Sequence, residues 1–66
     1  MTNKIKIHRA IKDISQEQLA QAIGVSRQTI NTMEKNKYVP STVLALKIAK
    51  YFGVMVEEIF FLEETD

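Results

Sequence analysis

Residues 15–31 read SQEQLAQAIGVSRQTIN, and this stretch decides the fold. Its start matches a capping box, in which the Ser15 side chain accepts from the backbone N–H of Gln18 and the side chain of Gln18 accepts from the backbone N–H of Ser15. Leu19 and Ile23, four residues apart, lie on one face of the helix that follows. The pattern therefore predicts a short helix with one apolar side, beginning just after Ser15.

A glycine and a serine separate this helix from a second one. Gly24 stands where a chain leaving a helix most often takes a left-handed backbone conformation. Ser26 is a favoured N-cap residue, and Ile30 and Met33 lie on the inner face of the helix that it starts. The two helices are expected over about residues 16–23 and 27–35. Two helices joined by a short turn with glycine are the arrangement of DNA-binding helix-turn-helix domains.

The outward side of the second helix carries side chains suited to base edges. A rotation of about 100° per residue turns one group of polar residues away from the core. This group consists of Gln28, Asn31, Thr32 and Lys35, with Arg27 on one flank. Amide side chains pair with adenine, arginine pairs with guanine, and a threonine methyl contacts thymine. An ordinary solvated helix face is the alternative, although such a face more often carries Glu–Lys pairs.

Length and composition favour one small domain, expected over residues 1–66. The sequence has no cysteine, which excludes disulfides, a thiol nucleophile and a cysteine zinc site. No apolar run reaches the roughly 18 residues of a membrane span, and the N-terminus lacks a signal-peptide pattern. We therefore expect a cytoplasmic, prokaryotic protein without a metal or cofactor. We do not expect an enzyme, because paired catalytic carboxylates, a suitably spaced Ser–His pair and a phosphate-binding glycine loop are all missing.

The small net charge of +1 hides an uneven distribution. Residues 1–50 contain nine basic and three acidic side chains, whereas residues 51–66 contain five acidic and no basic ones. A basic body with an acidic tail suits a protein that binds a polyanion and keeps its tail away from it. The charge pattern thus supports the helix-turn-helix interpretation.

A first helix is expected over residues 4–12, ending near Asp13. Ile5, His8 and Ile11 recur there at helical spacing and predict an apolar face. We expect His8 to be partly buried, neutral and hydrogen-bonded to a nearby backbone group. A metal ligand or a pH switch is the alternative, but no second histidine or cysteine supports a metal site.

Beyond residue 35 the pattern predicts a loop, two helices and a strand. The loop covers residues 36–40, because asparagine tolerates a left-handed helix stop and Pro40 cannot continue a helix. Ser41 then caps a helix that ends before Gly53. The expected elements after it are a short helix over residues 56–60 and an extended segment at residues 61–62, which pairs with the first three residues.

Several short motifs together resemble a known family. They are Gln16-x-x-Leu19-Ala20, Gly24-Val25-Ser26-Arg27-Gln28-Thr29-Ile30, Glu34, Pro40-Ser41 and Leu46-Lys47-Ile48-Ala49. Over about residues 4–60 the chain is similar to the Cro/CI-type, or xenobiotic-response-element, helix-turn-helix family, and within it to short stand-alone dimeric repressors. The resemblance implies an all-α fold: a compact five-helix lambda-repressor-like DNA-binding domain, with a small terminal antiparallel β-sheet. It places the helix-turn-helix at about residues 16–35 and a dimerisation segment at about residues 54–64.

The resemblance also assigns DNA-binding roles by matching positions. Gln16 falls where related phage repressors contact a phosphate, a role suited to the free N–H groups of a helix start. The positions that match base contacts and nearby phosphate contacts are Ser26, Arg27, Gln28, Asn31 and Thr32. The positions that match the loop along the DNA backbone are Lys35, Asn36, Lys37 and Tyr38. For Lys37 a solvated lysine is the alternative.

Structural roles are expected for three further groups. Arg9 and Glu34 match residues that form an ion pair in similar repressors, which removes the cost of an unpaired carboxylate near the core. Asp13 stands where many relatives have glycine, which implies a turn conformation that aspartate tolerates. A dimer interface is expected to include Met55, Phe60, Phe61 and Leu62, whereas Ile59 belongs to the core. The alternative is that these apolar residues simply complete the core.

Together these features predict a transcription regulator that binds double-stranded DNA in a sequence-specific way. The expected form is a homodimeric repressor on a pseudo-palindromic operator, with two recognition helices in major-groove segments about 34 Å apart. The alternative is an antitoxin-like or partner-recruited interaction module in which DNA binding is secondary. No small-molecule ligand is expected.

Overall fold

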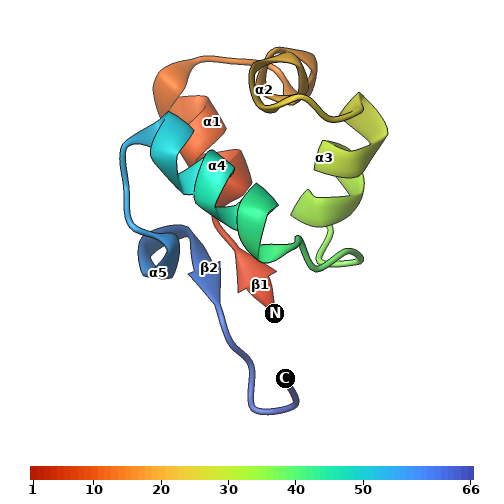
Figure 1. The fold of residues 1–66 in the computed structure, drawn as a ribbon, viewed down its shortest axis with the longest axis vertical. Coiled ribbons are helices and arrows are strands. Elements are labelled where there is room, and N and C mark those ends of the chain that lie inside the picture. The colour runs from red at the N-terminus through yellow and green to blue at the C-terminus, as the bar shows by residue number, and fades with distance from the viewer.

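The computed structural model describes residues 1–66 as five helices and a two-stranded antiparallel sheet. In chain order the elements are β1 (Thr2–Asn3), α1 (Ile5–Lys12), α2 (Gln16–Ile23), α3 (Arg27–Glu34), α4 (Thr42–Phe52), α5 (Val56–Ile59) and β2 (Phe60–Phe61). Helices α1 to α4 surround the core, and the sheet lies at one end beside α5 (Figure 1). No helix is both long and apolar enough to cross a membrane. The expected five-helix fold with a small terminal sheet is thus confirmed.

Serine side chains start three of the helices, as the sequence predicts. At α2 the capping box is complete: Ser15 Oγ accepts from the Gln18 backbone N–H at 3.0 Å, and the Ser15 N–H donates to Gln18 Oε1 at 2.8 Å. Ser26 and Ser41 each accept from a backbone N–H three residues along, both at 3.1 Å. Such caps satisfy N–H groups that a helix leaves unpaired in its first turn.

Left-handed residues end four of the helices, and Gly53, with φ 70°, closes α4. Gly24 closes α2 with φ 78°, and its N–H donates to the Ala20 carbonyl at 2.9 Å. Asp13 closes α1 with φ 56°, so the implied turn conformation is confirmed. Asn36, one residue beyond the C-cap of α3, has φ 61°. These sharp stops make the α1–α2 and α2–α3 connections only a few residues long.

The core is a single cluster drawn from all five helices and β2. Its buried members are Ile5, Leu19, Ala20, Ile23, Ile30, Met33, Leu44, Ile48, Ala49, Ile59 and Phe60. Fully burying one large apolar side chain stabilises a protein by roughly 1.5–3 kcal/mol. In α1 only Ile5 is buried. The prediction that Ile11 belongs to a buried apolar face of α1 was wrong, because Ile11 is 76 % exposed. The side chain of α1 that reaches α3 is Arg9, which lies one helical turn after the buried Ile5.

The C-terminal boundary lies one residue earlier than predicted. Helix α5 ends at Ile59, and Phe60 takes an extended conformation with φ −116° and ψ 136°. The strand pairs Thr2 with Phe61 and Asn3 with Phe60, so both the helix over residues 56–60 and the strand at residues 61–62 were shifted. Because successive strand residues point to opposite faces, this register turns Phe60 into the core and leaves Phe61 half-buried.

His8 has an aromatic neighbour instead of a hydrogen-bonded backbone group. Its ring is half-buried, with its centroid 5.5 Å from that of Phe52 on α4. The ring makes no hydrogen bond to the backbone, so that expectation was wrong. A tilted aromatic contact of this kind packs the imidazole through its apolar surface, which explains why histidine is accommodated between α1 and α4.

Candidate nucleic-acid interface

Helix α3 lies at the edge of the molecule with one side open to solvent (Figure 1). Ile30 and Met33 are fully buried and fix its inner side against α2 and the core. On the other side, Arg27 and Gln28 are exposed and Asn31 is half-buried. We call this outward surface the α3 face; its residues are Arg27, Gln28, Asn31, Thr32 and Lys35. The polar residues that the sequence placed opposite the core thus share one surface.

A polar hollow lies where the start of α2 meets the α3 face. It has a volume of about 310 Å³ and is lined by Gln16, Arg27, Gln28 and Asn31, with no hydrophobic residue. A second hollow of about 220 Å³ continues along α3 and is lined by Gln28, Thr29, Thr32 and Tyr38. Six residues of the predicted DNA contacts therefore border two adjoining depressions that share Gln28.

An ion pair anchors α3 to α1 behind this surface. Arg9 Nε donates to Glu34 Oε2 at 2.6 Å and Arg9 Nη2 donates to Glu34 Oε1 at 3.0 Å, a two-pronged contact. Arg9 Nη1 also donates to the Ile14 carbonyl at 3.0 Å. The hydrogen bonds that Arg9 donates to Glu34 raise the pKa of Arg9 above its usual value, so the guanidinium stays charged. The expected Arg9–Glu34 pair is present, and only 7 % of the Glu34 side chain is exposed.

Gln16 connects this ion pair to the α3 face. Its Nε2 donates to Glu34 Oε1 at 3.2 Å and to Asn31 Oδ1 at 3.4 Å. The side-chain amide of Gln16 is therefore engaged within the protein. Gln16 is suited to a phosphate contact through its position as the first residue of α2. The backbone N–H groups in the first turn of a helix have no partner within the helix and can bind an anion.

The two ends of α3 differ, because the first is capped by a serine and the second leads into an exposed loop. Ser26 Oγ lies 2.8 Å from Thr29 Oγ1 and accepts from the Thr29 N–H, so its oxygen is occupied by capping. Beyond the helix, the residues of the predicted backbone-contacting loop are all exposed: Lys35, Asn36, Lys37 and Tyr38. The loop thus presents two lysines and a tyrosine beside the α3 face.

Asn3 is a positioning residue that the sequence reading missed. Its Nδ2 donates to the Met33 carbonyl at 2.8 Å and to Asn36 Oδ1 at 3.3 Å. Its Oδ1 accepts from the Ile5 N–H at 3.1 Å, where α1 begins. One side chain therefore joins β1, the start of α1 and the end of α3. Asparagine just before a helix is a recognised capping signal that could have pointed to part of this role.

Comparison with known proteins agrees with this arrangement. Residues 5–59 match a protein family described as helix-turn-helix. The chain belongs to the Cro/CI-type helix-turn-helix family. It is 54 % identical to an uncharacterised HTH-type transcriptional regulator of Methanocaldococcus jannaschii, and the match covers both chains completely. It is 52 % identical to the uncharacterised HTH-type transcriptional regulator YgzD of Bacillus subtilis, over 97 % of each chain.

A more distant relative has a more specific name. The cryptic phage CTXphi transcriptional repressor RstR of Vibrio cholerae is 34 % identical, over 98 % of this chain and 59 % of its own length. The helix-turn-helix family therefore includes relatives of this chain that are named as regulators and one that is named as a repressor.

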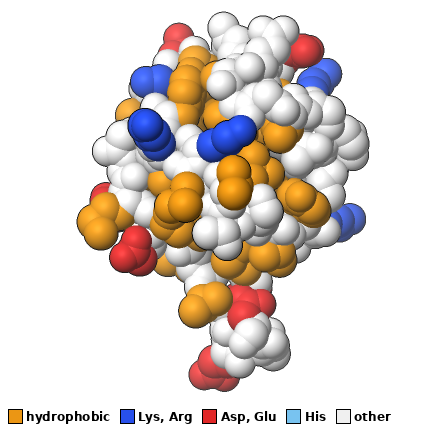
Figure 2. All heavy atoms as spheres, in the orientation of Figure 1, with side chains coloured by type: hydrophobic (Ala, Val, Ile, Leu, Met, Phe, Trp, Pro, Cys, Tyr) orange, Lys and Arg blue, Asp and Glu red, His pale blue; other side chains and the backbone are white.

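This helix-turn-helix protein has a second surface, which is apolar. A groove of about 480 Å³ runs between the loop before α4, α4 itself and the C-terminal strand. Its lining residues are Met1, Val39, Pro40, Thr42, Ala45, Leu46, Val56, Glu57 and Phe60, and we call it the apolar groove. Figure 2 shows orange side chains gathered over the face that includes α4, with acidic side chains on the tail below.

The four residues predicted at a dimer interface differ in exposure. Met55 is 62 % exposed and Leu62 is 82 % exposed, so both offer apolar area to a partner. Phe61 is half-buried, and the Lys4 ammonium lies 5.1 Å from its ring centroid. Phe60 is only 7 % exposed, because β2 turns it into the core, and it therefore offers little area.

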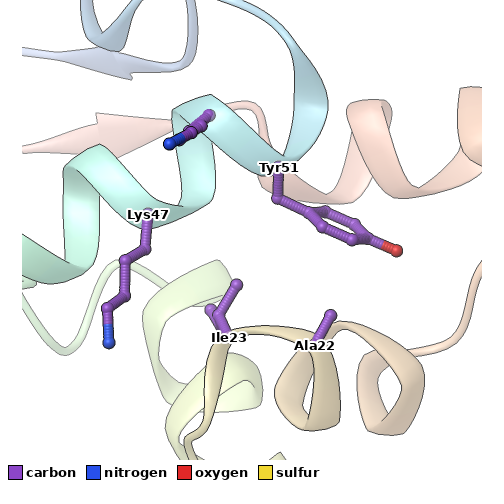
Figure 3. Close-up of a pocket in the computed structure, with 5 residues that line it drawn as sticks. Ala22, Ile23, Lys47 and Tyr51 are labelled. Carbon is purple, nitrogen blue, oxygen red and sulfur yellow. The ribbon is translucent and has the colours of Figure 1, made fainter.

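Another hollow, of about 310 Å³, lies on the surface between α2 and α4 (Figure 3). Its walls are Ala22 and Ile23 on one helix and Lys47, Lys50 and Tyr51 on the other. The group contains neither a carboxylate nor a histidine, and no three His, Asp or Glu side chains of the protein cluster tightly enough to hold a metal ion. This hollow thus lacks an acid–base pair, and the α3 face remains the strongest candidate for a functional surface.

Proposed function

We propose that this protein is a transcription regulator that binds double-stranded DNA sequence-specifically through the α3 face. The observation that carries the proposal is the pair of adjoining hollows along α3, opposite the buried Ile30 and Met33, the first of which is lined by polar residues alone. An α-helix with its side chains is about 10–12 Å wide, which fits a major groove about 12 Å wide. Amide, hydroxyl and guanidinium groups on such a helix can read the edges of bases.

The charges around α3 support the same conclusion. Arg27, Lys35 and Lys37 are exposed on the helix and in the loop after it. Glu34 is the only carboxylate on α3, and its charge is balanced by Arg9 at 2.6 Å. The surface therefore carries unpaired positive groups without an opposing exposed acid on the same helix, as contact with phosphates requires.

We further propose that the protein acts as a homodimeric repressor. Met55, Leu62 and the apolar groove provide exposed apolar surface at the end of the molecule that carries the termini. Two copies joined there would place two α3 helices in successive major-groove segments, about 34 Å apart on a pseudo-palindromic operator. The name of the phage relative RstR supports repression, which needs only occupancy of the site.

Selection of bound sequences from a random duplex library tests sequence-specific binding. We expect the wild-type protein to enrich one two-fold symmetric site. Gln28→Ala should cost roughly 1–3 kcal/mol on that site and relax the preference at one base pair in each half, with little change on random DNA. Enrichment of no site would contradict the proposal and favour the interaction-module alternative.

Lys37→Ala provides the matched control for a phosphate contact. Because a lysine acts as a point charge, its loss should weaken binding to the selected site and to random DNA alike. The slope of log affinity against log salt should fall by about one phosphate per subunit. Titrations at several salt concentrations measure it. An unchanged slope would show that Lys37 makes no phosphate contact and is only solvated.

A further inference from the structure

Thr32 fixes the orientation of the Gln28 side-chain amide. The Thr32 hydroxyl donates its single hydrogen to the Gln28 backbone carbonyl at 2.8 Å. Its oxygen can therefore only accept from the Gln28 side chain, whose Nε2 lies 3.2 Å away. A reversed amide would bring Oε1 against the hydroxyl lone pairs without a hydrogen between them. Gln28 Oε1 is thus the amide atom that has no partner in the protein.

Glu34 fixes the orientation of the Asn31 side-chain amide through Gln16. Here the end of the amide that stays free is the donor and not the acceptor. A carboxylate that is paired with Arg9 can only accept, so the Gln16 atom at 3.2 Å from Glu34 must be its amino group. The second hydrogen of that Nε2 is then directed to Asn31, 3.4 Å away, and requires an acceptor there. Asn31 Oδ1 is consequently engaged inside the protein. Both hydrogens of Asn31 Nδ2 remain without a partner.

We propose that these two hydrogen-bond chains determine which bases the α3 face selects. Gln28 presents an acceptor and prefers a base with an exocyclic amine, adenine or cytosine. Asn31 presents two donor hydrogens and prefers guanine, whose N7 and O6 both accept, or thymine, whose O4 accepts, over adenine, whose N6 amine opposes a donor. Thr32, Gln16 and Glu34 are then positioning residues for specificity. The inference rests on the proposed function, because it concerns the same surface.

Thr32→Val removes the hydroxyl with little change of shape and tests the first chain. Without it the Gln28 amide can rotate and present either end to DNA. In selections from the random duplex library, the preference for adenine or cytosine at the base pair identified by Gln28→Ala should fall about tenfold. Thr32→Ser keeps the hydroxyl and should retain the wild-type preference, provided that both variants melt cooperatively near the wild-type temperature.

Gln28→Glu and Asn31→Asp form a second, charge-matched pair. Each adds one negative charge to α3, so the general loss of DNA affinity is similar. Gln28→Glu keeps the acceptor and should retain its base preference, whereas Asn31→Asp replaces the donor and should lose about tenfold of its preference for guanine or thymine. The measured quantity is the ratio of affinities for two duplexes that differ at one base pair, which cancels the shared charge effect.

The outcomes separate the inference from the proposed function. If the wild-type protein enriches no site, both are wrong. If it enriches a site, but Thr32→Val has the same base preference as Thr32→Ser, the orientation by Thr32 is wrong and DNA reading remains. Equal losses in Gln28→Glu and Asn31→Asp would likewise overturn the assigned acceptor and donor.

Discussion

The α3 face and the apolar groove differ in whether their side chains already have partners within the protein. Behind the α3 face, Arg9, Glu34, Gln16 and Asn31 form a continuous chain of hydrogen bonds, and no buried side-chain polar atom in the protein lacks a partner. Around the apolar groove, large hydrophobic side chains lie open to solvent. One surface is already ordered for specific polar contacts, whereas the other is the surface that the proposed second copy would cover.

Breaking the ion pair should have the largest effect and should change stability. Arg9→Ala leaves the nearly buried Glu34 carboxylate without its partner, for which a cost of about 3–5 kcal/mol is typical. Urea unfolding followed by circular dichroism measures this loss. Arg9→Lys keeps the charge but loses the two-pronged geometry, so its free energy of unfolding should lie between the two. Wild-type stability of Arg9→Ala would mean that the pair is solvated.

A charge on the apolar side should instead change association. Leu62→Glu places a carboxylate on a side chain that is 82 % exposed, so the free energy of unfolding should change by less than about 0.5 kcal/mol. The dissociation constant of the proposed dimer should rise at least about tenfold, or about 1.4 kcal/mol. Sedimentation equilibrium measures this constant.

Ile11→Glu is the matched control for this experiment. Ile11 is similarly exposed, at 76 %, but it lies on α1 and not in the C-terminal segment. The variant should therefore associate as the wild-type protein does. Equal weakening by both substitutions would move the interface to another face, and a monomeric wild-type protein at micromolar concentration would rule out the dimer.

Relief of backbone strain should give the smallest effect, a gain in stability. Asp13 takes φ 56° and ψ 49°, a left-handed conformation that costs a residue with a Cβ roughly 1–2 kcal/mol. Aspartate tolerates it better than most residues, and glycine adds entropy to the unfolded chain. We therefore expect Asp13→Gly to stabilise the protein by about 0.5 kcal/mol in urea unfolding. A loss of stability would show that the Asp13 side chain makes a favourable contribution.

The local signals of the sequence predicted the helix ends well. Ser15, Ser26 and Gly24 act through neighbours within a few residues, so their roles follow from spacing alone. The strand boundary at Phe60 and the exposure of Ile11 depend on contacts between distant segments, which spacing does not encode.

The candidate site divides in the same way. The polar residues of α3 were predictable because helical rotation places them opposite the core. The two hydrogen bonds that Gln16 donates from α2 to α3 were not predictable, and neither were those that join Asn3 to the start of α1 and the end of α3. Each depends on how separate elements pack against one another. Long-range hydrogen bonds of this kind become visible only in the folded molecule.

The pairing of β1 with β2 also has a consequence for the order of folding. It joins Thr2 to Phe61, so nearly the whole chain forms the loop that must close. Because closing so long a loop costs entropy, the two strands pair late in folding, after the helices have made their more local contacts. We therefore expect substitutions at Thr2 and at Phe61 to accelerate unfolding while leaving the folding rate nearly unchanged. The carbonyl of Met33 would then gain its hydrogen bond from Asn3 only in the last step.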